Sequence, residues 1–347
     1  MNEPSPTVGR AGGEHRVLEP PGGVPLDAAR LDALAELWDG EARLELEAVV
    51  LGAASHRAWT ERLGTDPVRL AGALVESVAE RGGLGEEAAD ATVIGRVGAV
   101  GTAHPPEVQV GERVGVAWPA TALPLFAAPT PAWDGGPVVP LEGHAIVPPR
   151  GVTVPVGDEA VATAALLTQL ADLPSALVPG HRLVVLGTDR PAGLVAVAVA
   201  AAQGRHVTAV VSSLADARLL RAVGADVAVV LAAGEPVESA DHLSASGPPP
   251  DLVVVAGGGE ALAARLAPSV QVLAGTTPGT PSAIVAHARS IGRRVAIHAG
   301  RGIATDRGAA LDALLTDRPL LRAMLRWHAE GGPRPAVPPA VDDQELP

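Results

Sequence analysis

From Arg182 onward, short runs of apolar and β-branched residues alternate with alanine-rich segments, and this alternation constrains the fold more than any other feature of the chain. The apolar runs predict strands covered on both faces, and the alanine-rich segments between them predict helices. The strands are expected at Arg182–Gly187, His206–Ser212, Asp226–Leu231, Asp251–Ala256, Val270–Ala274 and Arg293–His298, and the helices at 192–203, 214–223, 260–267, 280–290 and 306–328. Such an order predicts a doubly wound parallel α/β sheet of the Rossmann type, whose ligand lies beyond the carboxyl ends of the strands.

The first half has a different pattern, in which short runs of alternating apolar and polar residues are separated by residues typical of turns. Strands are expected at Ala42–Leu51, Ala91–Val100, Glu112–Trp118 and Gly136–Val147, and an amphipathic helix at Pro67–Arg81. A chain of 347 residues is long enough for two domains. We therefore expect a leader without fixed structure (1–13), a β-rich catalytic domain (14–160), a dinucleotide-binding domain (161–304), a C-terminal helix packed back on the core (305–330) and a tail without fixed structure (331–347).

Composition excludes several kinds of chemistry. The chain has no Cys, no Tyr and no Lys, so thiol nucleophiles, cysteine-ligated zinc, Schiff bases with pyridoxal phosphate and Walker A loops are excluded. A formal charge of −13 argues against a nucleic-acid or membrane partner. The N-terminal residues lack the order of a signal peptide, which predicts a cytoplasmic protein. The ten His residues form no zinc-binding spacing, so no metal site is expected.

The segment after the first Rossmann strand has the position of a phosphate loop. Gly187 and Thr188 would make the turn, and Gly193 would allow the following helix to approach the sheet. Arg190 stands where a middle glycine would let the backbone approach a pyrophosphate, so its side chain would either obstruct a cofactor or pair with its phosphates.

The second Rossmann strand ends in Ser212 and Ser213, with no acidic residue at its tip to bind the ribose hydroxyls of NAD. This favours NADP over NAD, with Ser212, Ser213 and Arg218 meeting a 2′-phosphate. The alternative is that the two serines cap the helix that starts at Leu214.

Candidates for proton transfer are ionisable residues expected near a cleft between the domains. Glu142 and His144 are a candidate base and its orienting partner, and His56 is a third candidate; ordinary surface roles are the alternative for all three. Candidate contacts with substrate or nicotinamide are Thr168, Gln169 and His298, although Thr168 and Gln169 also fit simple helix packing. Arg318, Arg322 and Arg326 are interpreted as a solvated helix face, or else as a surface for a partner.

Several motifs resemble the medium-chain dehydrogenases and reductases, namely Ile94–Gly101, Val110–Val116 and Ala222–Asp226. A narrower resemblance is to the L-erythro-3,5-diaminohexanoate dehydrogenase family, carried by Glu14–Pro20, the helix at 67–81, Glu142–Ile146 and Gly300–Gly302. It implies a GroES-like N-terminal β-domain before the Rossmann domain. It also implies zinc-independent, NAD(P)-linked oxidative deamination of a diamino acid, or the reverse reductive amination.

Three departures from that family's pattern affect its expected sites. Ala162–Thr168 replaces a family motif of which only Gln169 remains, Arg190 replaces the middle glycine, and 275–292 holds no acidic residue for a substrate ammonium. The leading hypothesis is therefore an oxidoreductase using NADP or NAD on a small amino or keto acid. The alternative is a non-catalytic paralog that retains the fold as an interaction module. A homodimer is expected on general grounds.

Overall fold

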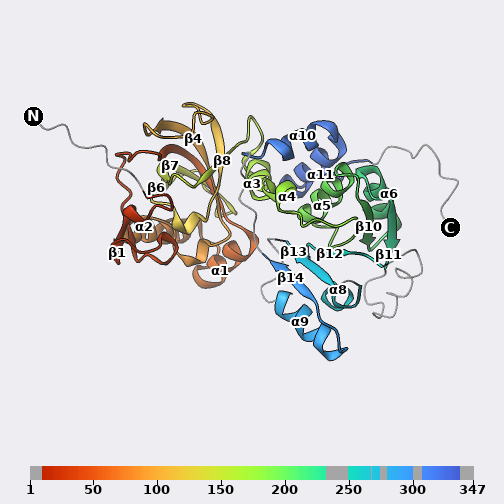
Figure 1. The fold of residues 1–347 in the computed structure, drawn as a ribbon. Coiled ribbons are helices and arrows are strands. Elements are labelled where there is room, and N and C mark those ends of the chain that lie inside the picture. Colours follow the sequence, from red (N-terminus) through yellow and green to blue (C-terminus); the bar gives the residue numbers. More distant parts are fainter. Residues whose placement is uncertain (1–9, 232–248, 267, 274–279, 300–306, 337–347) are drawn as a thin grey trace, which may run out of the picture. The chain divides into compact units, whose positions relative to one another are not determined.

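A computed structural model describes residues 10–231, 249–266, 268–273, 280–299 and 307–336 of the chain. The chain divides into two compact units, residues 1–171 and residues 172–347 (Figure 1). Most of the leader and tail expected at 1–13 and 331–347 lies outside the described residues. The units meet in sequence after Ala171, so the segment 161–171, which we expected to open the second domain, is grouped with the first.

The first unit is built on an antiparallel six-stranded sheet with the order β6-β7-β3-β4-β5-β8, beside a small pair of β1 and β2. The strands are β1 Val17–Glu19, β2 Arg30–Leu31, β3 Ala42–Val50, β4 Thr92–Val100, β5 Arg113–Ala117, β6 Leu125–Pro129, β7 Val138–Val147 and β8 Val152–Pro155. Inward side chains of the strands, such as Leu44 and Val93, form one apolar core together with Trp59 of the helix at 53–63. The four predicted strands correspond to β3, β4, β5 and β7.

Three α-helices belong to the first unit: α1 Ala53–Leu63, α2 Pro67–Arg81 and α3 Val161–Leu170. Short 3₁₀ turns occur at Glu14–Arg16, Pro25–Asp27, Glu86–Ala88 and Ala120–Ala122. Helix α2 has the predicted bounds because Asp66 caps it, Pro67 opens it and Gly82 ends it in a left-handed conformation. Helix α1 was not predicted, because only Ser55 and Trp59 of its residues are buried and no apolar stripe marks it.

The second unit holds a six-stranded, all-parallel sheet with the order β11-β10-β9-β12-β13-β14. The strands are β9 Arg182–Leu186, β10 His206–Val211, β11 Val227–Val230, β12 Leu252–Val255, β13 Ser269–Val272 and β14 Ala296–Ala299. The chain starts at β9 in the centre, runs outward to β11, and then returns to β12 on the other side of β9. This is the doubly wound order predicted from the sequence.

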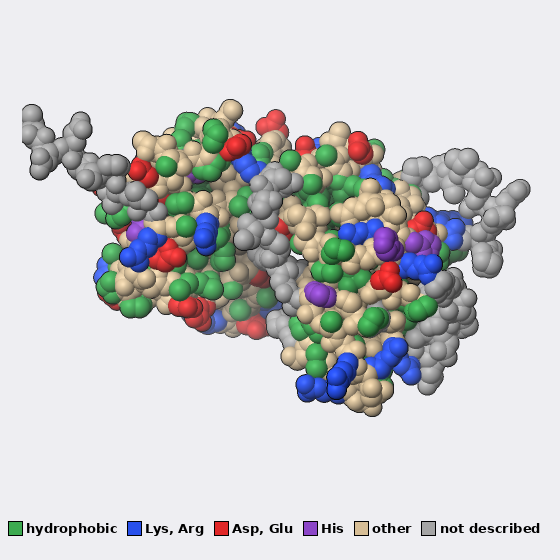
Figure 2. Space-filling view, in the orientation of Figure 1, with side chains coloured by type: hydrophobic (Ala, Val, Ile, Leu, Met, Phe, Trp, Pro, Cys, Tyr) green, Lys and Arg blue, Asp and Glu red, His purple; other side chains and the backbone are tan. Residues whose placement is uncertain are grey.

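The helices of the second unit are α4 Leu173–Ala176, α5 Pro191–Ala202, α6 Leu214–Val223, α8 Glu260–Leu266, α9 Thr280–Ser290, α10 Ala309–Asp317 and α11 Pro319–Glu330. Helix α5 is apolar on all sides and buried from Gly193 to Ala200, because it packs against the sheet on one side and against α10 and α11 on the other (Figure 1). Arginine side chains gather at the end of this unit that carries α9 (Figure 2). Every blue side chain in Figure 2 is an arginine, because the chain has no Lys. No helix in the described ranges is long and apolar enough to cross a bilayer.

The prediction of one helix at 306–328 is wrong in one respect. The structure has two helices, α10 and α11, with a break at Arg318 and Pro319. Pro319 opens α11, and a residue before proline is disfavoured in the helical conformation, so Arg318 leaves it (φ −129°, ψ 75°). The predicted solvated face of arginines fits the exposed Arg326 but not Arg318 and Arg322. The Arg318 guanidinium donates to the Val223 carbonyl oxygen at the end of α6, and Arg322 pairs with Asp312 at 2.8 Å. Arg318 therefore ties the junction of the two helices to α6, and Arg322 ties α11 to α10.

A buried ion-pair network joins the start of the chain to β3. Arg16 (1% exposed) and Glu41 (0%) form a bidentate pair, with Nε to Oε1 at 3.0 Å and Nη2 to Oε2 at 2.6 Å. His15 accepts the Arg10 backbone N–H on Nδ1 (2.9 Å), so Nε2 carries the proton and donates to Glu41 Oε1 at 2.6 Å. Burial would raise the pKa of Glu41, but hydrogen bonds from Arg16 and the Trp38 N–H outweigh it and lower that pKa. The motif Glu14–Pro20 therefore has a structural role.

Candidate functional site

The carboxyl ends of β9 and β12 form the point at which the strand order of the parallel sheet reverses. Gly187 follows β9 and Gly257 follows β12, and the two backbones are in close contact. A Cβ on Gly187 would lie 2.5 Å from both the nitrogen and the oxygen of Gly257. Gly187 also has a φ of 73°, which a side chain would disfavour. Glycine at 187 is thus required for the two strand ends to approach each other.

The loop from Gly187 to Arg190 is fixed by short contacts. Thr188 is buried and its Oγ1 donates to the Val210 carbonyl oxygen of β10 at 2.7 Å. Gly193, in the first turn of α5, would place a Cβ 2.4 Å from the Gly187 oxygen. The close helix-to-strand packing expected of Gly193 is therefore present. The start of α5 has no side-chain cap. Its first residue, Pro191, has no N–H, so the amides of Ala192 and Gly193 are those that lack an intrahelical partner.

Arg190 is the N-cap residue of α5, and its side chain is 68% exposed. The guanidinium forms a long ion pair with Asp189, with 3.9 Å between Nε and Oδ2. The stem of the side chain lies beside Gly257, since a Cβ on Gly257 would be 3.5 Å from Arg190 Cγ and 3.7 Å from Nε. The guanidinium is thus loosely held at the helix N-terminus, at the strand ends where the phosphate loop was expected.

Sequence reasoning missed the triple glycine at 257–259, which lies directly across from the phosphate loop. All three glycines have positive φ values, of 159°, 67° and 75°. A Cβ on Gly259 would come 3.0 Å from Leu186 Cδ1 of β9. The available signal was a run of three glycines between a predicted strand and a predicted helix, a position at which a ligand or another backbone comes close.

At the tip of β10, the helix-capping interpretation of Ser213 holds. The Asp216 backbone N–H donates to Ser213 Oγ at 3.1 Å, and Ser213 Oγ donates to the Asp216 carboxylate at 2.5 Å, which together form a reciprocal capping arrangement. Ser212 Oγ reaches the same carboxylate at 3.4 Å. The expectation that no acid lies near this strand tip is therefore wrong, because Asp216 folds back to it from one turn inside α6.

A cation also lies at the tip of β10, and it comes from the far end of the chain. The Arg334 guanidinium, beyond α11, donates to Asp216 Oδ1. Burial would raise the pKa of Asp216, but hydrogen bonds from Ser213 and Arg334 and the charge of Arg334 lower it. Arg218, the cation expected at this place, is exposed on α6. No sequence pattern linked residues 118 positions apart.

The end of α11 places Arg334 through aromatic contacts. The guanidinium lies over the Trp327 ring, 5.6 Å from its centroid, and Trp327 Nε1 donates to the Gly332 carbonyl oxygen at 3.1 Å. The Trp327 ring also contacts His328, with 4.6 Å between centroids. Burial lowers the pKa of His328; Asp189 opposes this, and Arg334 and Arg190 add to it. Arg190, His328 and Arg334 therefore lie within electrostatic range of one another.

The proton-transfer candidates of the first unit are not joined to one another. His144, on β7, shares a hydrogen bond with the Ala33 carbonyl oxygen at 2.8 Å and stacks on Phe126. Glu142 is exposed two residues earlier on the same strand, so both side chains leave the same face of the sheet. His56, in α1, shares a hydrogen bond with the Gly135 carbonyl oxygen at 3.0 Å. Backbone groups, and not the Glu142 carboxylate, orient the two imidazoles.

The three candidate substrate contacts each have a structural partner. Thr168 is buried and its Oγ1 donates to the Ala164 carbonyl oxygen at 2.8 Å, which favours the helix-packing interpretation. Gln169 Nε2 donates to Thr92 Oγ1 at 2.9 Å. His298 is the next-to-last residue of β14, and its Nε2 contacts Ser269 Oγ, at the first residue of β13, at 2.9 Å.

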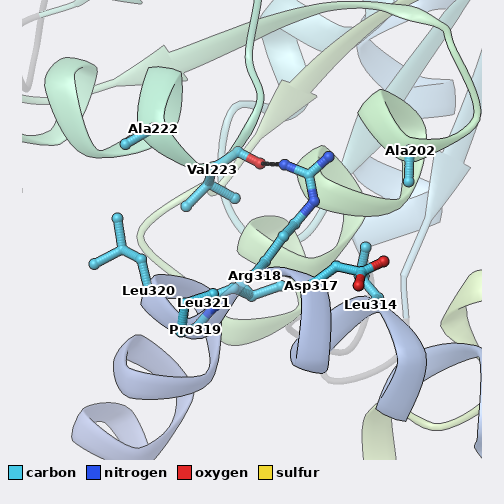
Figure 3. Close-up of a pocket in the computed structure, with 9 residues that line it drawn as sticks. All are labelled: Ala202, Ala222, Val223, Leu314, Asp317, Arg318, Pro319, Leu320 and Leu321. Carbon is cyan, nitrogen blue, oxygen red and sulfur yellow. Dashed lines mark hydrogen bonds between the residues drawn. The ribbon is translucent and has the colours of Figure 1, made fainter. Parts of the chain in front are cut away.

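A pocket of about 540 Å³ lies on the side of the sheet opposite the phosphate loop, toward the amino ends of the strands (Figure 3). It is formed where α5 and α6 end and α10 meets α11, and Arg318 spans it to reach Val223. Helices of a doubly wound sheet end near the amino ends of the strands, so this pocket is separate from the phosphate loop. Within the described ranges, no group of three or more His, Asp or Glu is arranged to hold a metal ion.

The chain has an antiparallel β-domain followed by a parallel sheet, and the strand order of that sheet reverses at a glycine-rich loop. This combination defines a class of fold. The fold is that of the medium-chain dehydrogenases and reductases, a GroES-like domain followed by a Rossmann domain. Residues 15–156 match the N-terminal domain of L-erythro-3,5-diaminohexanoate dehydrogenase. This match confirms the resemblance to that family expected from the sequence.

Solved structures share the fold at low sequence identity. The alcohol dehydrogenase TADH from Thermus sp. ATN1 is 18% identical with a TM-score of 0.50, covering 88% of this chain and 91% of that one. A mycobacterial protein complexed with NADPH is 19% identical with a TM-score of 0.45, covering 91% and 84%. A quinone oxidoreductase from Coxiella burnetii is 16% identical with a TM-score of 0.47, covering 85% of each chain. Among curated protein sequences, none matches the chain.

Proposed function

We propose that the protein is an NAD(P)-dependent oxidoreductase that works without zinc and acts on a small amino or keto acid. The observation that carries this proposal is the close approach of Gly187 and Gly257 at the switch point of the parallel sheet, beside the uncapped start of α5. A nicotinamide dinucleotide supplies a hydride acceptor or donor when bound. The residues of this chain would bind and orient it.

The phosphate loop fits the pyrophosphate of such a cofactor. Gly187 and Gly193 keep the loop and helix compact, and the first amides of α5 favour a negative charge. Arg190 is exposed and weakly paired, so its guanidinium is able to turn toward a phosphate and donate charge-assisted hydrogen bonds. Of the two alternatives that the sequence left open for Arg190, we therefore propose phosphate binding.

For the substrate we propose a 3,5-diamino acid, on the basis of the family that residues 15–156 match. Oxidation at the carbon bearing the amino group passes a hydride to the oxidised cofactor and a proton to a base. Water then adds to the resulting imine and ammonium leaves, which gives the oxo acid. Glu142 is the candidate base or ammonium ligand, because its carboxylate is exposed on β7, two residues before His144 on the same face of the strand.

Turnover of L-erythro-3,5-diaminohexanoate with NADP⁺ or NAD⁺ tests this proposal, followed by the absorbance of the reduced nicotinamide. We expect turnover with the native protein and a loss of about 100-fold in Glu142→Gln, since general acid–base groups contribute on this scale. Glu76→Gln, on the exposed side of α2, is the matched control and should leave the rate unchanged. Equal rates in the Glu142→Gln and Glu76→Gln variants would reject the role of Glu142.

A second candidate function is a non-catalytic interaction module. The position of the Arg190 stem beside Gly257, at the strand ends, is the observation that favours it. In that case the native protein would bind neither NADPH nor NADH, and Arg190→Gly would restore binding. Turnover of any diamino acid by the native protein would reject this candidate.

A further inference from the structure

The tip of β10 and the phosphate loop belong to one continuous surface. The Thr188 hydroxyl is bonded to the Val210 carbonyl oxygen at 2.7 Å, which fixes the loop beside the last residues of β10. Arg190 follows Thr188 by two residues, and Ser212 follows Val210 by two residues. In a doubly wound fold, the pyrophosphate of a dinucleotide lies at the first of these places and the adenosine ribose at the second.

The charges at the tip of β10 are those of Asp216 and Arg334. The Asp216 carboxylate accepts hydrogen bonds from both serines on Oδ2, and Arg334 binds Oδ1. An acid in this position would by itself accept ribose hydroxyls and repel a 2′-phosphate. Because Arg334 is paired with it, the local charge is compensated, and the Arg334 side chain stays 40% exposed.

The Trp327 ring also holds Arg334 in place. Its guanidinium lies on the Trp327 ring, and that ring is fixed by a 3.1 Å hydrogen bond from Nε1 to the Gly332 carbonyl oxygen. A planar guanidinium fixed on one face and at one edge retains further N–H groups for a phosphate. Such preorganisation reduces the entropic cost of binding.

We propose that Arg334, carried by the segment after α11, is the residue that selects a dinucleotide with a 2′-phosphate over one with free ribose hydroxyls. This inference rests on the proposed function and assigns to Arg334 the role that sequence reasoning gave to Arg218. Removal of Arg334 leaves the Asp216 charge uncompensated. The site then repels the 2′-phosphate and accepts ribose hydroxyls, so the cofactor preference moves from NADPH toward NADH.

Calorimetric titration of the full chain with NADPH and with NADH tests this selection. We expect the ratio of the NADH to the NADPH dissociation constant to fall by about tenfold or more in Arg334→Met, the scale of a lost charge-assisted hydrogen bond. Arg334→Lys should retain most of the preference because it keeps the charge. Asp216→Asn combined with Arg334→Met should recover part of the NADPH affinity because the repulsion is removed.

Arg322→Met is the matched control, since Arg322, on α11, is like Arg334 a partly exposed arginine paired with an aspartate. In Arg322→Met, the ratio of the NADH to the NADPH dissociation constant should stay at the native value. A purely structural role for Arg334 would weaken both dinucleotides equally, and an unchanged ratio in Arg334→Met would overturn the inference while leaving the proposed function intact. Failure of the native protein to bind either dinucleotide would overturn both.

Discussion

A Cβ added to Gly187, at the end of β9, would lie 2.5 Å from the backbone nitrogen and oxygen of Gly257, at the end of β12. The two strands are neighbours in the sheet although Leu252, at the start of β12, follows Gly187 by 65 positions in the sequence. Their contact brings the phosphate loop and the triple glycine to the same place. The geometry of the proposed cofactor site therefore depends on the absence of a side chain at Gly187.

Gly187→Ala should impair both stability and cofactor binding. A left-handed conformation costs about 1–2 kcal/mol for a residue other than glycine, and the contact with Gly257 adds to this. We expect NADPH affinity to fall at least about tenfold, because displacement of the loop removes the phosphate contacts. Gly204→Ala is the control, since Gly204 has a similar φ of 70° but nothing within 4 Å of its Cβ position. Chemical unfolding and calorimetric titration measure the two effects; equal behaviour of both variants would contradict the role of the close approach.

Arg190→Met should weaken NADPH binding by about 10- to 100-fold, the range that corresponds to a hydrogen bond with a charged group. Arg221→Met is the control, because Arg221 is exposed in the last turn of α6, at the opposite end of that helix from Ser213. Titration of both variants with NADPH measures the difference. Tighter binding by Arg190→Met would show that the guanidinium obstructs the site, and the role that we assign to it would be wrong.

Much of the fold was predictable because its signals are local. The bounds of α2 and α6 follow from capping residues and apolar periodicity within each segment. The break between α10 and α11 had a local signal as well, the proline at 319, but the apolar period continues across it. Helix α1 gave no such signal, since only Ser55 and Trp59 of its residues are buried.

The candidate site was predicted only in part, for a physical reason. Gly187, Thr188 and Gly193 were found because the phosphate loop is a local strand-to-helix motif. The pairing of Asp216 with Ser213 also had a local signal, a serine followed three residues later by an acid. The contact of Arg334 with Asp216 depends on tertiary folding across 118 residues, which a single sequence does not reveal.

Glu41→Ala should lower the free energy of unfolding by about 3–5 kcal/mol, because it leaves the buried Arg16 guanidinium without its bidentate partner. Glu19→Ala removes an exposed pair with Arg30, in which both side chains are more than half exposed, and should cost less than about 1 kcal/mol. Urea unfolding compares the two variants. Losses of equal size would mean that the Arg16–Glu41 pair does not stabilise the first unit.

The same pair predicts how stability depends on pH. The folded pKa of Glu41 is below its ordinary value of 4.5, so the pair's contribution is fully present above pH 4.5 and is lost as the pH falls through the folded pKa. Urea unfolding across this acidic range should show a shallower loss of stability in Glu41→Gln than in the native protein, while Glu19→Gln should keep the native slope. Parallel curves for all three proteins would contradict a lowered pKa for Glu41.

Calorimetric titration of the native protein with NADPH, followed by NADH, shows whether the switch point of the parallel sheet binds a nicotinamide cofactor. We expect one NADPH bound per chain with a micromolar dissociation constant, and weaker binding of NADH, because Gly187, Arg190 and Arg334 provide contacts for the phosphates. No heat of binding for either dinucleotide at millimolar concentration would contradict the claim that the glycine-lined switch point holds a nicotinamide cofactor.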